Sequence, residues 1–323
     1  MKVKIPVEED LADRLMAFWA RIFGESGDLD RSFLLGDEAE WNEATLYVEE
    51  KEGRPISTCM TVRSRSQPGL SGFAEVATDL DYRGRGLASK LCRQAVDDFW
   101  ATGGEALFLG TGNPAAVRIY DRLGWRKLAG ANVMVNIRGD GSPEEFLVDY
   151  FRTPGEVAIE PAGPDARVPM IPLIWTPHDH QVLDANVHLF SRRYVLQPSC
   201  MGLHPRYSRT LEGCGKWFVA RTEDGRVVGL SSAKMDDGEG RVDAFVHRRY
   251  RHTWDQLIRV AIDWCRERSL SPVAVVSVED ERKRGLFEAL GFHPDVRTHE
   301  PFDVSGRMVE AVGLSHSQEQ ENL

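Results

Sequence analysis

The sequence predicts an α/β chain (α+β by some schemes) of two successive units, each with a mixed central sheet flanked by helices. Runs that alternate like strands are separated by runs whose apolar residues recur at helical spacing. The second half also repeats the order of the first, because Leu123–Trp125 is matched by Leu290–Phe292 and Tyr82-Arg83 by Tyr250-Arg251. A length of 323 residues suits two domains of roughly 150 residues each.

The breaks in composition predict where the domains begin and end. We expect a first domain over residues 1–150, a linker over 151–165, a second domain over 166–313 and a disordered tail over 314–323. Pro and Gly gather in and before the linker, which suits an exposed connection. The tail is polar and offers little apolar surface to bury.

Several elements follow from spacing and turn residues. A helix is expected from about Glu9 to Phe23, because apolar residues recur there at helical spacing. Asn113 and Pro114 carry the signals of a helix start, and Gly124 that of a helix end. Further strands are expected over 44–49, 56–62, 72–80 and 105–112, and further helices over 144–152 and 184–196.

Composition and charge exclude several classes of function. A net charge of −10 and a pI near 5.5 argue against nucleic acid as a partner, because phosphate binding depends on surplus Lys and Arg. No apolar run reaches membrane-spanning length, and the N-terminus lacks the apolar core of a signal peptide. Five widely spaced cysteines fit reduced thiols in a cytoplasm and give no support for a metal site. His178 and His180 are expected to be surface or capping residues.

The segment Tyr82–Ser89, Tyr-Arg-Gly-Arg-Gly-Leu-Ala-Ser, follows an expected strand and opens an amphipathic helix. A glycine-rich turn at a helix N-terminus presents backbone N–H groups and the positive end of the helix dipole, and Arg83 and Arg85 add positive charge. The spacing is neither the G-x-G-x-x-G of dinucleotide sites nor the G-x-x-x-x-G-K-[ST] of Walker loops. The plain alternative is a turn without a ligand. The preferred interpretation is an anion site of another kind.

Two motifs together carry a resemblance to a known family. Arg83–Ala88 reads R-x-x-G-x-A, and Asn113–Tyr120 reads N-x-x-A-x-x-x-Y with a Gly-Trp pair after it. In this order and spacing they resemble the acetyl-coenzyme A motifs of the GNAT acetyltransferase superfamily. The resemblance implies a splayed sheet, acetyl-CoA as co-substrate and no metal ion. The coenzyme site that it implies comprises Val76, Ala77, Thr78, Arg83, Gly84, Arg85, Gly86, Leu87, Ala88, Ser89, Asn113, Ala116 and Tyr120.

Amide formation needs one group that takes the proton of the attacking ammonium and another that protonates the departing thiolate. By the resemblance, Glu75 is the expected base, and Tyr120 is the expected acid from its spacing after Asn113. Backbone N–H groups near Val76 and Ala77 are expected to meet the oxyanion. The alternatives are a strand carboxylate paired with an Arg for Glu75 and a core tyrosine for Tyr120.

The acceptor is expected to be a primary amine of a small molecule. Asp79 is expected on the same strand face as Glu75. A run of acidic residues after the first helix would attract a cationic amine if it lined the acceptor wall, although a solvated charged face is the plainer interpretation. These acidic residues are Glu25, Asp28, Asp30, Asp37, Glu38 and Glu40.

The second copy lacks the parts that carry chemistry. Its loop after Arg251 is about two residues shorter and has no glycine, Asp280 replaces Asn113, and Phe287 replaces Tyr120. The second domain is therefore expected to be a scaffold. The tandem arrangement is also distantly similar to mycothiol synthase-like proteins, although those keep their motifs in the C-terminal half. The competing hypotheses are a coenzyme A sensor without catalysis, or an acetyltransferase of proteins or peptides. Oligomeric state, a homodimer included, is left open.

Overall fold

The chain divides into two compact units. The structure is a computed structural model that describes residues 1–24, 27–196, 199–297 and 299–316. The first unit comprises Met1–Tyr150, Gly163–Ile171 and Pro198–Pro205, and the second comprises Phe151–Ala162, Pro172–Gln197 and Arg206–Leu323. The units therefore differ from the continuous domains expected from composition, because two later segments belong to the first unit.

Polar contacts explain why residues 163–171 belong to the first unit. The Arg167 guanidinium forms a buried ion pair with Glu38, with Nη2 and Oε1 2.5 Å apart. The Asn42 side chain donates to the carbonyl oxygen of Pro164 at 2.9 Å. Buried charges need a partner of opposite sign, so this pair fastens the segment to the first unit.

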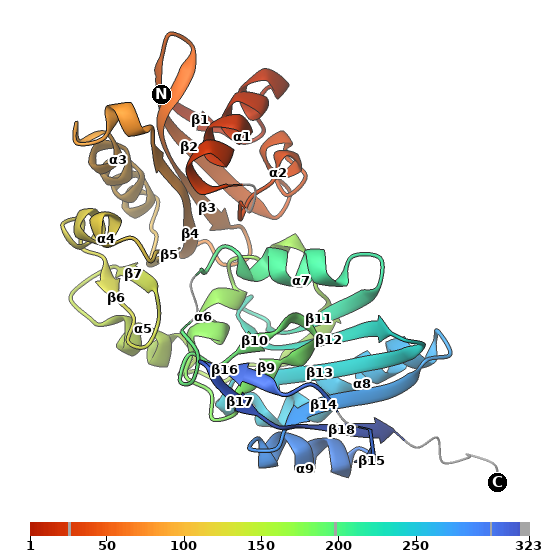
Figure 1. The fold of residues 1–323 in the computed structure, drawn as a ribbon. Helices are drawn as coiled ribbons and strands as arrows, with labels where there is room; N and C mark the ends of the chain where they lie inside the picture. The colour runs from red at the N-terminus through yellow and green to blue at the C-terminus, as the bar shows by residue number, and fades with distance from the viewer. Residues whose placement is uncertain (25–26, 197–198, 298, 317–323) are drawn as a thin grey trace. The chain divides into compact units, whose positions relative to one another are not determined.

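The first unit is built on a seven-stranded mixed sheet of order β1-β2-β3-β4-β5-β7-β6. Figure 1 shows α1 and α2 on one face of this sheet and α3 and α4 on the other. Its strands are β1 (Lys2–Lys4), β2 (Asn42–Lys51), β3 (Arg54–Ser64), β4 (Leu70–Thr78), β5 (Ala106–Gly110), β6 (Arg126–Lys127) and β7 (Val133–Ile137). Its helices are α1 (Glu9–Phe23), α2 (Arg31–Leu35), η1 (Leu80–Tyr82), α3 (Leu87–Ala101), α4 (Pro114–Asp121) and α5 (Pro143–Tyr150). These elements confirm the predicted helices near 9–23 and 144–152 and the four predicted strands.

The first sheet divides between β4 and β5. These parallel strands pair only from Leu70–Gly72 to Ala106–Phe108. Beyond Gly72, β4 continues to its end paired with β3 alone among the described residues, while β5 continues beside β7. The far half of β4 therefore has a free backbone edge that faces a fork in the sheet. The splayed sheet implied by the resemblance is confirmed.

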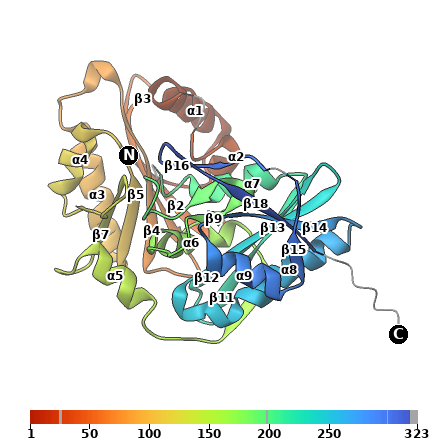
Figure 2. The same ribbon diagram turned by 60° about the horizontal axis from the view of Figure 1, so that its bottom comes forward.

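The second unit repeats this topology with a seven-stranded sheet of order β8-β11-β12-β13-β14-β18-β15. Its parallel strands β13 and β14 also pair only at the start, from Glu239–Arg241 to Ser271–Val273, and then diverge. The helix α8 packs on β12 and β13, and α9 packs on β14 (Figure 2). The strands are β8 (Val157–Pro161), β11 (Gly215–Thr222), β12 (Val227–Asp236), β13 (Glu239–Val246), β14 (Ser271–Ser277), β15 (Phe292–Pro294) and β18 (Ala311–His316). Apart from one short helix given below, the described helices after residue 163 are η2 (Pro164–Ala166), α6 (Met170–Trp175), α7 (Leu203–Leu211), η4 (Arg248–Thr253), α8 (Trp254–Arg266) and α9 (Glu281–Ala289).

Two predictions for the second half are wrong in part. The helix expected over 184–196 is replaced by short elements, because His188 adopts a left-handed φ of 51° that ends the turn before it. The tail expected from residue 314 is strand up to His316, and residues 317–323 lie outside the described range. The short elements are β9 (Val182–Asp184), η3 (Ala185–Val187), β10 (Leu189–Phe190), β16 (Phe302–Val304) and β17 (Arg307–Val309). No helix within the described ranges is both long and apolar enough to cross a bilayer.

Candidate active site

Glu75 lies in a β-bulge of β4. Glu75 and Val76 together oppose the single residue Cys59 of β3. Glu75 also takes a φ of 51°, a left-handed conformation that side chains other than Gly rarely adopt. The bulge breaks the alternation of the strand, and Asp79 does not line the cavity described below. Its carboxylate instead accepts from the N–H of Asp81 at 3.1 Å.

A buried pair of hydrogen bonds holds the bulge. The Thr58 hydroxyl donates to the carbonyl oxygen of Glu75 at 2.7 Å. The same hydroxyl accepts from Trp19 Nε1 at 3.0 Å, which connects the bulge to α1. Backbone strain of this kind persists only where the surroundings enforce it. Trp19 and Thr58 therefore position the Glu75 backbone.

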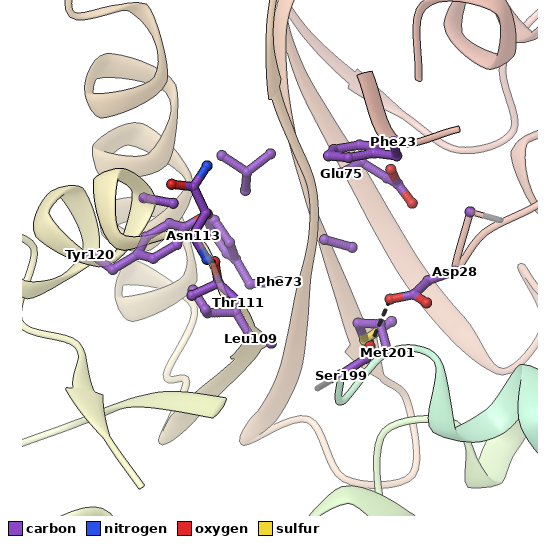
Figure 3. A pocket seen from close by; sticks show the side chains of 16 residues that line it. Phe23, Asp28, Phe73, Glu75, Leu109, Thr111, Asn113, Tyr120, Ser199 and Met201 are labelled. Carbon is purple, nitrogen blue, oxygen red and sulfur yellow. Dashed lines mark hydrogen bonds between the residues drawn. The ribbon is translucent and has the colours of Figure 1, made fainter. Parts of the chain in front are cut away.

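A cavity of about 330 Å³ occupies the fork between β4 and β5. Its labelled side chains lie on both sides of β4 (Figure 3). One group, called the acidic wall from here on, consists of Phe23, Asp28, Glu75, Ser199 and Met201. The other group, called the tyrosine wall, consists of Phe73, Leu109, Thr111, Asn113 and Tyr120. Both walls belong to the first unit, although Ser199 and Met201 come from the second half of the chain.

The acidic wall is closed by a loop that approaches the backbone of β4. Ser199 Oγ donates to Asp28 Oδ2 at 2.8 Å (Figure 3), and it accepts from the N–H of Gly202 at 3.0 Å. Met201 packs on Gly72, since its sulfur lies 1.9 Å from the position that a Cβ on Gly72 would take. Only glycine allows so close an approach at this point of the strand.

The tyrosine wall is placed by α4. The Asn113 side chain caps this helix by accepting from the N–H of Ala115 at 2.9 Å, as the sequence predicts. Tyr120 lies in the last turn and is buried edge-on against Phe73, with ring centroids 6.5 Å apart, and near Trp125 at 5.9 Å. These contacts fix the ring, so the tyrosine faces the cavity in a defined orientation.

The two walls have opposite protonation chemistry. Burial first, and then the charge of Asp28, raises the pKa of Glu75 to about 8, while the N–H of Leu29 donates to the carboxylate and opposes the shift. The charged neighbour of Glu75 is thus a carboxylate and not the Arg of the alternative interpretation. Burial also raises the pKa of Tyr120 well above its usual range. The cavity therefore holds a carboxyl poised near neutral pH and a hydroxyl that keeps its proton.

The glycine loop presents open backbone donors. In the described structure, none of the N–H groups from Gly84 to Ser89 donates to a backbone or side-chain acceptor. Gly84 and Gly86 take left-handed φ values of 76° and 77°, and a Cβ on either would meet no atom within 4 Å. Arg83 donates to the carbonyl oxygen of Thr78 and Arg85 to that of Asp81, at 3.2 and 3.0 Å. The loop leaves its N–H groups exposed at the start of α3.

The structure brings some of the predicted site residues together and leaves others apart. The predicted residues that line the cavity are Glu75, Val76, Asn113, Ala116 and Tyr120. The residues from Arg83 to Ser89 lie outside it on the glycine loop. Ala77 and Thr78 also lie outside, and Ser57 donates to the carbonyl oxygen of Ala77 at 3.1 Å.

Four residues of the acidic wall were missed or undervalued by the sequence analysis. Phe23, Ser199 and Met201 carry no motif, so no local signal identifies them. Asp28 belongs to the acidic run, where a solvated face was the plainer interpretation, yet it lines the cavity. Of its neighbours, Asp30 caps α2, Glu38 pairs with Arg167, and Glu25 lies outside the described residues.

Of the two histidines expected to be surface or capping residues, His178 is buried and His180 is partly buried. His178 is buried, its Nε2 lies 2.9 Å from the carbonyl oxygen of Leu173, and its ring packs edge-on against Phe245. His180 packs beside Trp254 with ring centroids 5.3 Å apart. Across the described ranges, no group of three or more His, Cys, Asp or Glu is arranged to hold a metal ion.

The loop after Arg251 in the second unit differs in length and in contacts from the glycine loop of the first unit. Two residues separate Arg251 from α8, against three between Arg83 and α3, so the loop is shorter by one residue and not by two. The short helix η4 runs directly into α8, and the N–H of Trp254 donates to Arg251. The Trp254 indole N–H donates to the carbonyl oxygen of Ala244 in β13 at 3.1 Å. A side chain thus covers the strand edge that is free in the first unit.

Asp280 and Phe287 also differ in role from the residues that they replace. Asp280 makes no side-chain cap, and its carboxylate accepts from the N–H groups of Gln181 and Val182 at 2.7 and 3.0 Å. Phe287 is fully buried against Phe292. The carboxylate therefore binds the first two residues of the segment 181–187, which is called the filling segment from here on.

The sequence is similar to one known protein family. The family model described as acetyltransferase (GNAT) family matches residues 11–125, and no curated protein matches the sequence.

Among solved structures, spermidine N-acetyltransferase from Vibrio cholerae, in complex with CoA and spermine, is 16% identical with a TM-score of 0.38. The match covers 49% of this chain and 94% of that one. An N-acetyltransferase from Staphylococcus aureus Mu50 is 12% identical with a TM-score of 0.40, covering 50% and 98%. Ribosomal-protein-S18-alanine N-acetyltransferase from Escherichia coli is 15% identical with a TM-score of 0.33, covering 44% and 97%. Residues 11–125 form an acyltransferase domain of the acetyltransferase (GNAT) family.

Proposed function

We propose that this protein transfers an acetyl group from acetyl-CoA to a primary amine of a small molecule by direct attack of the amine on the thioester. One observation carries the proposal: the buried carboxyl of Glu75 and the protonated hydroxyl of Tyr120 line a single cavity in the fork of the sheet. The cavity of about 330 Å³ suits a small acceptor better than a folded protein surface.

The residues present fit acetyl-CoA in two respects. The open N–H groups from Gly84 to Ser89, with the dipole of α3 and the exposed Arg83 and Arg85, suit a diphosphate. The free edge of β4 near Val76 offers backbone groups to an extended amide chain. Bound acetyl-CoA supplies the activated acetyl group, which the side chains of this protein do not provide.

The two walls would then divide the proton transfers. The ionised Glu75 takes a proton from the ammonium of the acceptor, directly or through one water, and leaves a neutral amine. The nitrogen forms a bond to the acetyl carbon as the carbon–sulfur bond breaks. Tyr120 gives its proton to the departing sulfur. Backbone N–H groups near Val76 are candidates for stabilising the oxyanion.

The test is a thiol-release assay with acetyl-CoA across a panel of primary amines. We expect turnover by the wild type and a loss of about 10²-fold or more in kcat for Tyr120→Phe, with acetyl-CoA binding unchanged by calorimetry. The matched control is Tyr150→Phe, which removes a hydroxyl bonded to Gln67 outside the cavity. A protein that binds acetyl-CoA without turnover would be a sensor. Equal rates for wild type and Tyr120→Phe would remove Tyr120 from the mechanism.

A further inference from the structure

The lining of the cavity is one-sided in charge. Its charged side chains among the described residues are Asp28 and Glu75, and this lining includes no Lys, Arg or His. The charge of Asp28 contributes to the raised pKa of Glu75, so the two carboxyl groups interact. Such a cavity disfavours an acceptor that carries a carboxylate or phosphate and favours one that carries positive charge.

Asp28 is oriented before any acceptor binds. Ser199 donates to its Oδ2 and is itself held by the N–H of Gly202. A Cβ on Gly202 would lie 2.6 Å from Asp28 Oδ1, so the loop packs directly on the carboxylate. A charged group fixed by its neighbours in this way is preorganised for a ligand.

Glu75 and Asp28 have different tasks in the proposed transfer. Glu75 takes up a proton and becomes neutral, so it no longer balances a positive charge. Asp28 makes no proton transfer, and a carboxylate in a partly buried cavity is stabilised by a cation that stays charged throughout. The acceptor nitrogen itself loses its charge, so that cation must belong to a second group of the same molecule.

We propose, on the basis of the proposed function, that the acceptor is a short aliphatic amine with a second cationic group, and that Asp28 binds this group. Ser199 is then a positioning residue, because it acts through Asp28. Met201 closes the acidic wall against Gly72, which restricts the acceptor to a short chain. The second half of the chain thereby contributes to the selectivity of the first unit.

Three acceptors with four carbons each test the charge at the far end. With the full chain and saturating acetyl-CoA, we expect kcat/KM to fall at least tenfold from 1,4-diaminobutane to n-butylamine and to fall further for 4-aminobutanoate. If n-butylamine or 4-aminobutanoate equals the diamine, the inference is wrong while the proposed function stands. If no primary amine releases thiol, the proposed function itself has failed.

Variants test whether Asp28 is the binding group. Asp28→Asn should raise KM for the diamine at least tenfold and change KM for n-butylamine less than twofold, so that the preference disappears. Asp28→Glu should restore part of it. The matched control is Asp37→Asn, an exposed residue of the same acidic run that does not line the cavity. An equal loss for both substrates would mean that Asp28 only supports the loop, and the proposal would be overturned.

Discussion

The two forks of this molecule share one topology and differ in what occupies them. In the first unit, β4 continues past the fork over residues 73–78 and includes the bulge at Glu75. In the second, β13 continues over residues 242–246 and pairs with β12 without a shift of register. The extra residue of β4 is therefore the bulge. This one inserted residue orients the Glu75 carboxyl toward the fork.

The second fork is filled by the chain itself. Lys283 and Asp243 form a fully buried ion pair with Nζ and Oδ1 2.5 Å apart, and Lys283 also donates to the carbonyl oxygens of Val182 and Leu183. Asp243 accepts from the N–H of Ala185 at 2.7 Å. A separate cavity of about 540 Å³ beside the filling segment is lined by Arg241 and Val275 among others, and no tyrosine is among the described residues of its lining.

The difference shows what the fold needs to become a site. In both units two parallel strands diverge, and backbone N–H and C=O groups at the divergence lose their strand partners. In the second unit, the Trp254 indole N–H donates to the carbonyl oxygen of Ala244 in β13, while Asp280 and Lys283 bind the filling segment beside it. The first leaves the edge and the glycine loop free, so that a ligand can satisfy them.

The largest expected effect comes from opening the filled fork. Lys283→Met leaves the buried carboxylate of Asp243 without its cation, and we expect a loss of about 3–5 kcal/mol in the free energy of unfolding. Urea unfolding measures it. The control is Lys4→Met, which breaks an exposed pair with Glu43 and should cost about 0–1 kcal/mol. Equal midpoints for the two variants would show that the ion pair does not hold the filling segment.

The next effect comes from blocking the open loop. Gly86→Asp adds a negative charge and a Cβ at a left-handed position, and we expect acetyl-CoA to bind about 100-fold more weakly by calorimetry. Gly53→Asp is the control, because Gly53 has a similar φ of 72° in an exposed hairpin turn. If both variants bind as the wild type does, the diphosphate lies elsewhere.

A smaller effect concerns the raised pKa of Glu75, about 8 in the folded protein against an ordinary value near 4.5. The folded state binds more protons than the unfolded state between these values, so this group makes stability fall as pH rises from about 4.5 to about 8. Glu75→Gln should therefore raise the melting temperature at pH 9, by the equivalent of about 1–3 kcal/mol, and change it little at pH 4.

The same variant tests catalysis. For the wild type, kcat/KM should rise with pH until about 8 as Glu75 ionises, and Glu75→Gln should lose this limb together with most of the activity. Glu52→Gln is the control, because Glu52 shares the left-handed φ, 52°, in an exposed turn. An unchanged pH profile in Glu75→Gln would exclude Glu75 as the base.

The sequence predicted the parts of the site that depend on local spacing. The cap at Asn113 and the place of Tyr120 seven residues later follow from helix geometry, which is short-range. Glu75 was placed on its strand, but the bulge was not foreseen, because bulges depend on pairing between strands. Ser199 was missed because it lies 171 positions along the chain from Asp28, and no local pattern encodes that contact.

The prediction for residues 184–196 failed for a related reason. Asp184 looks like a helix cap, and it does accept from the N–H of Asn186. The N–H of Ala185 donates instead to Asp243, a partner far along the chain. His188 then turns into the left-handed region. Tertiary hydrogen bonds decide the outcome where the local signal is ambiguous.

The smallest expected effect tests the support of the bulge at a position that holds an apolar residue in the filled fork. Thr58 pairs with Ala77, the penultimate residue of β4, and Leu230 holds the matching position opposite Phe245 in β13. Thr58→Val keeps the shape and removes the hydroxyl that bridges Trp19 Nε1 and the carbonyl oxygen of Glu75. We expect a loss of about 1–2 kcal/mol in unfolding free energy, because two buried groups lose their partner. We also expect kcat to fall several-fold while KM for acetyl-CoA stays unchanged, because only the orientation of the Glu75 carboxyl changes. A loss of stability without any change in kcat would show that the bulge keeps its geometry unaided, and the extra residue alone would then distinguish the open fork from the filled one.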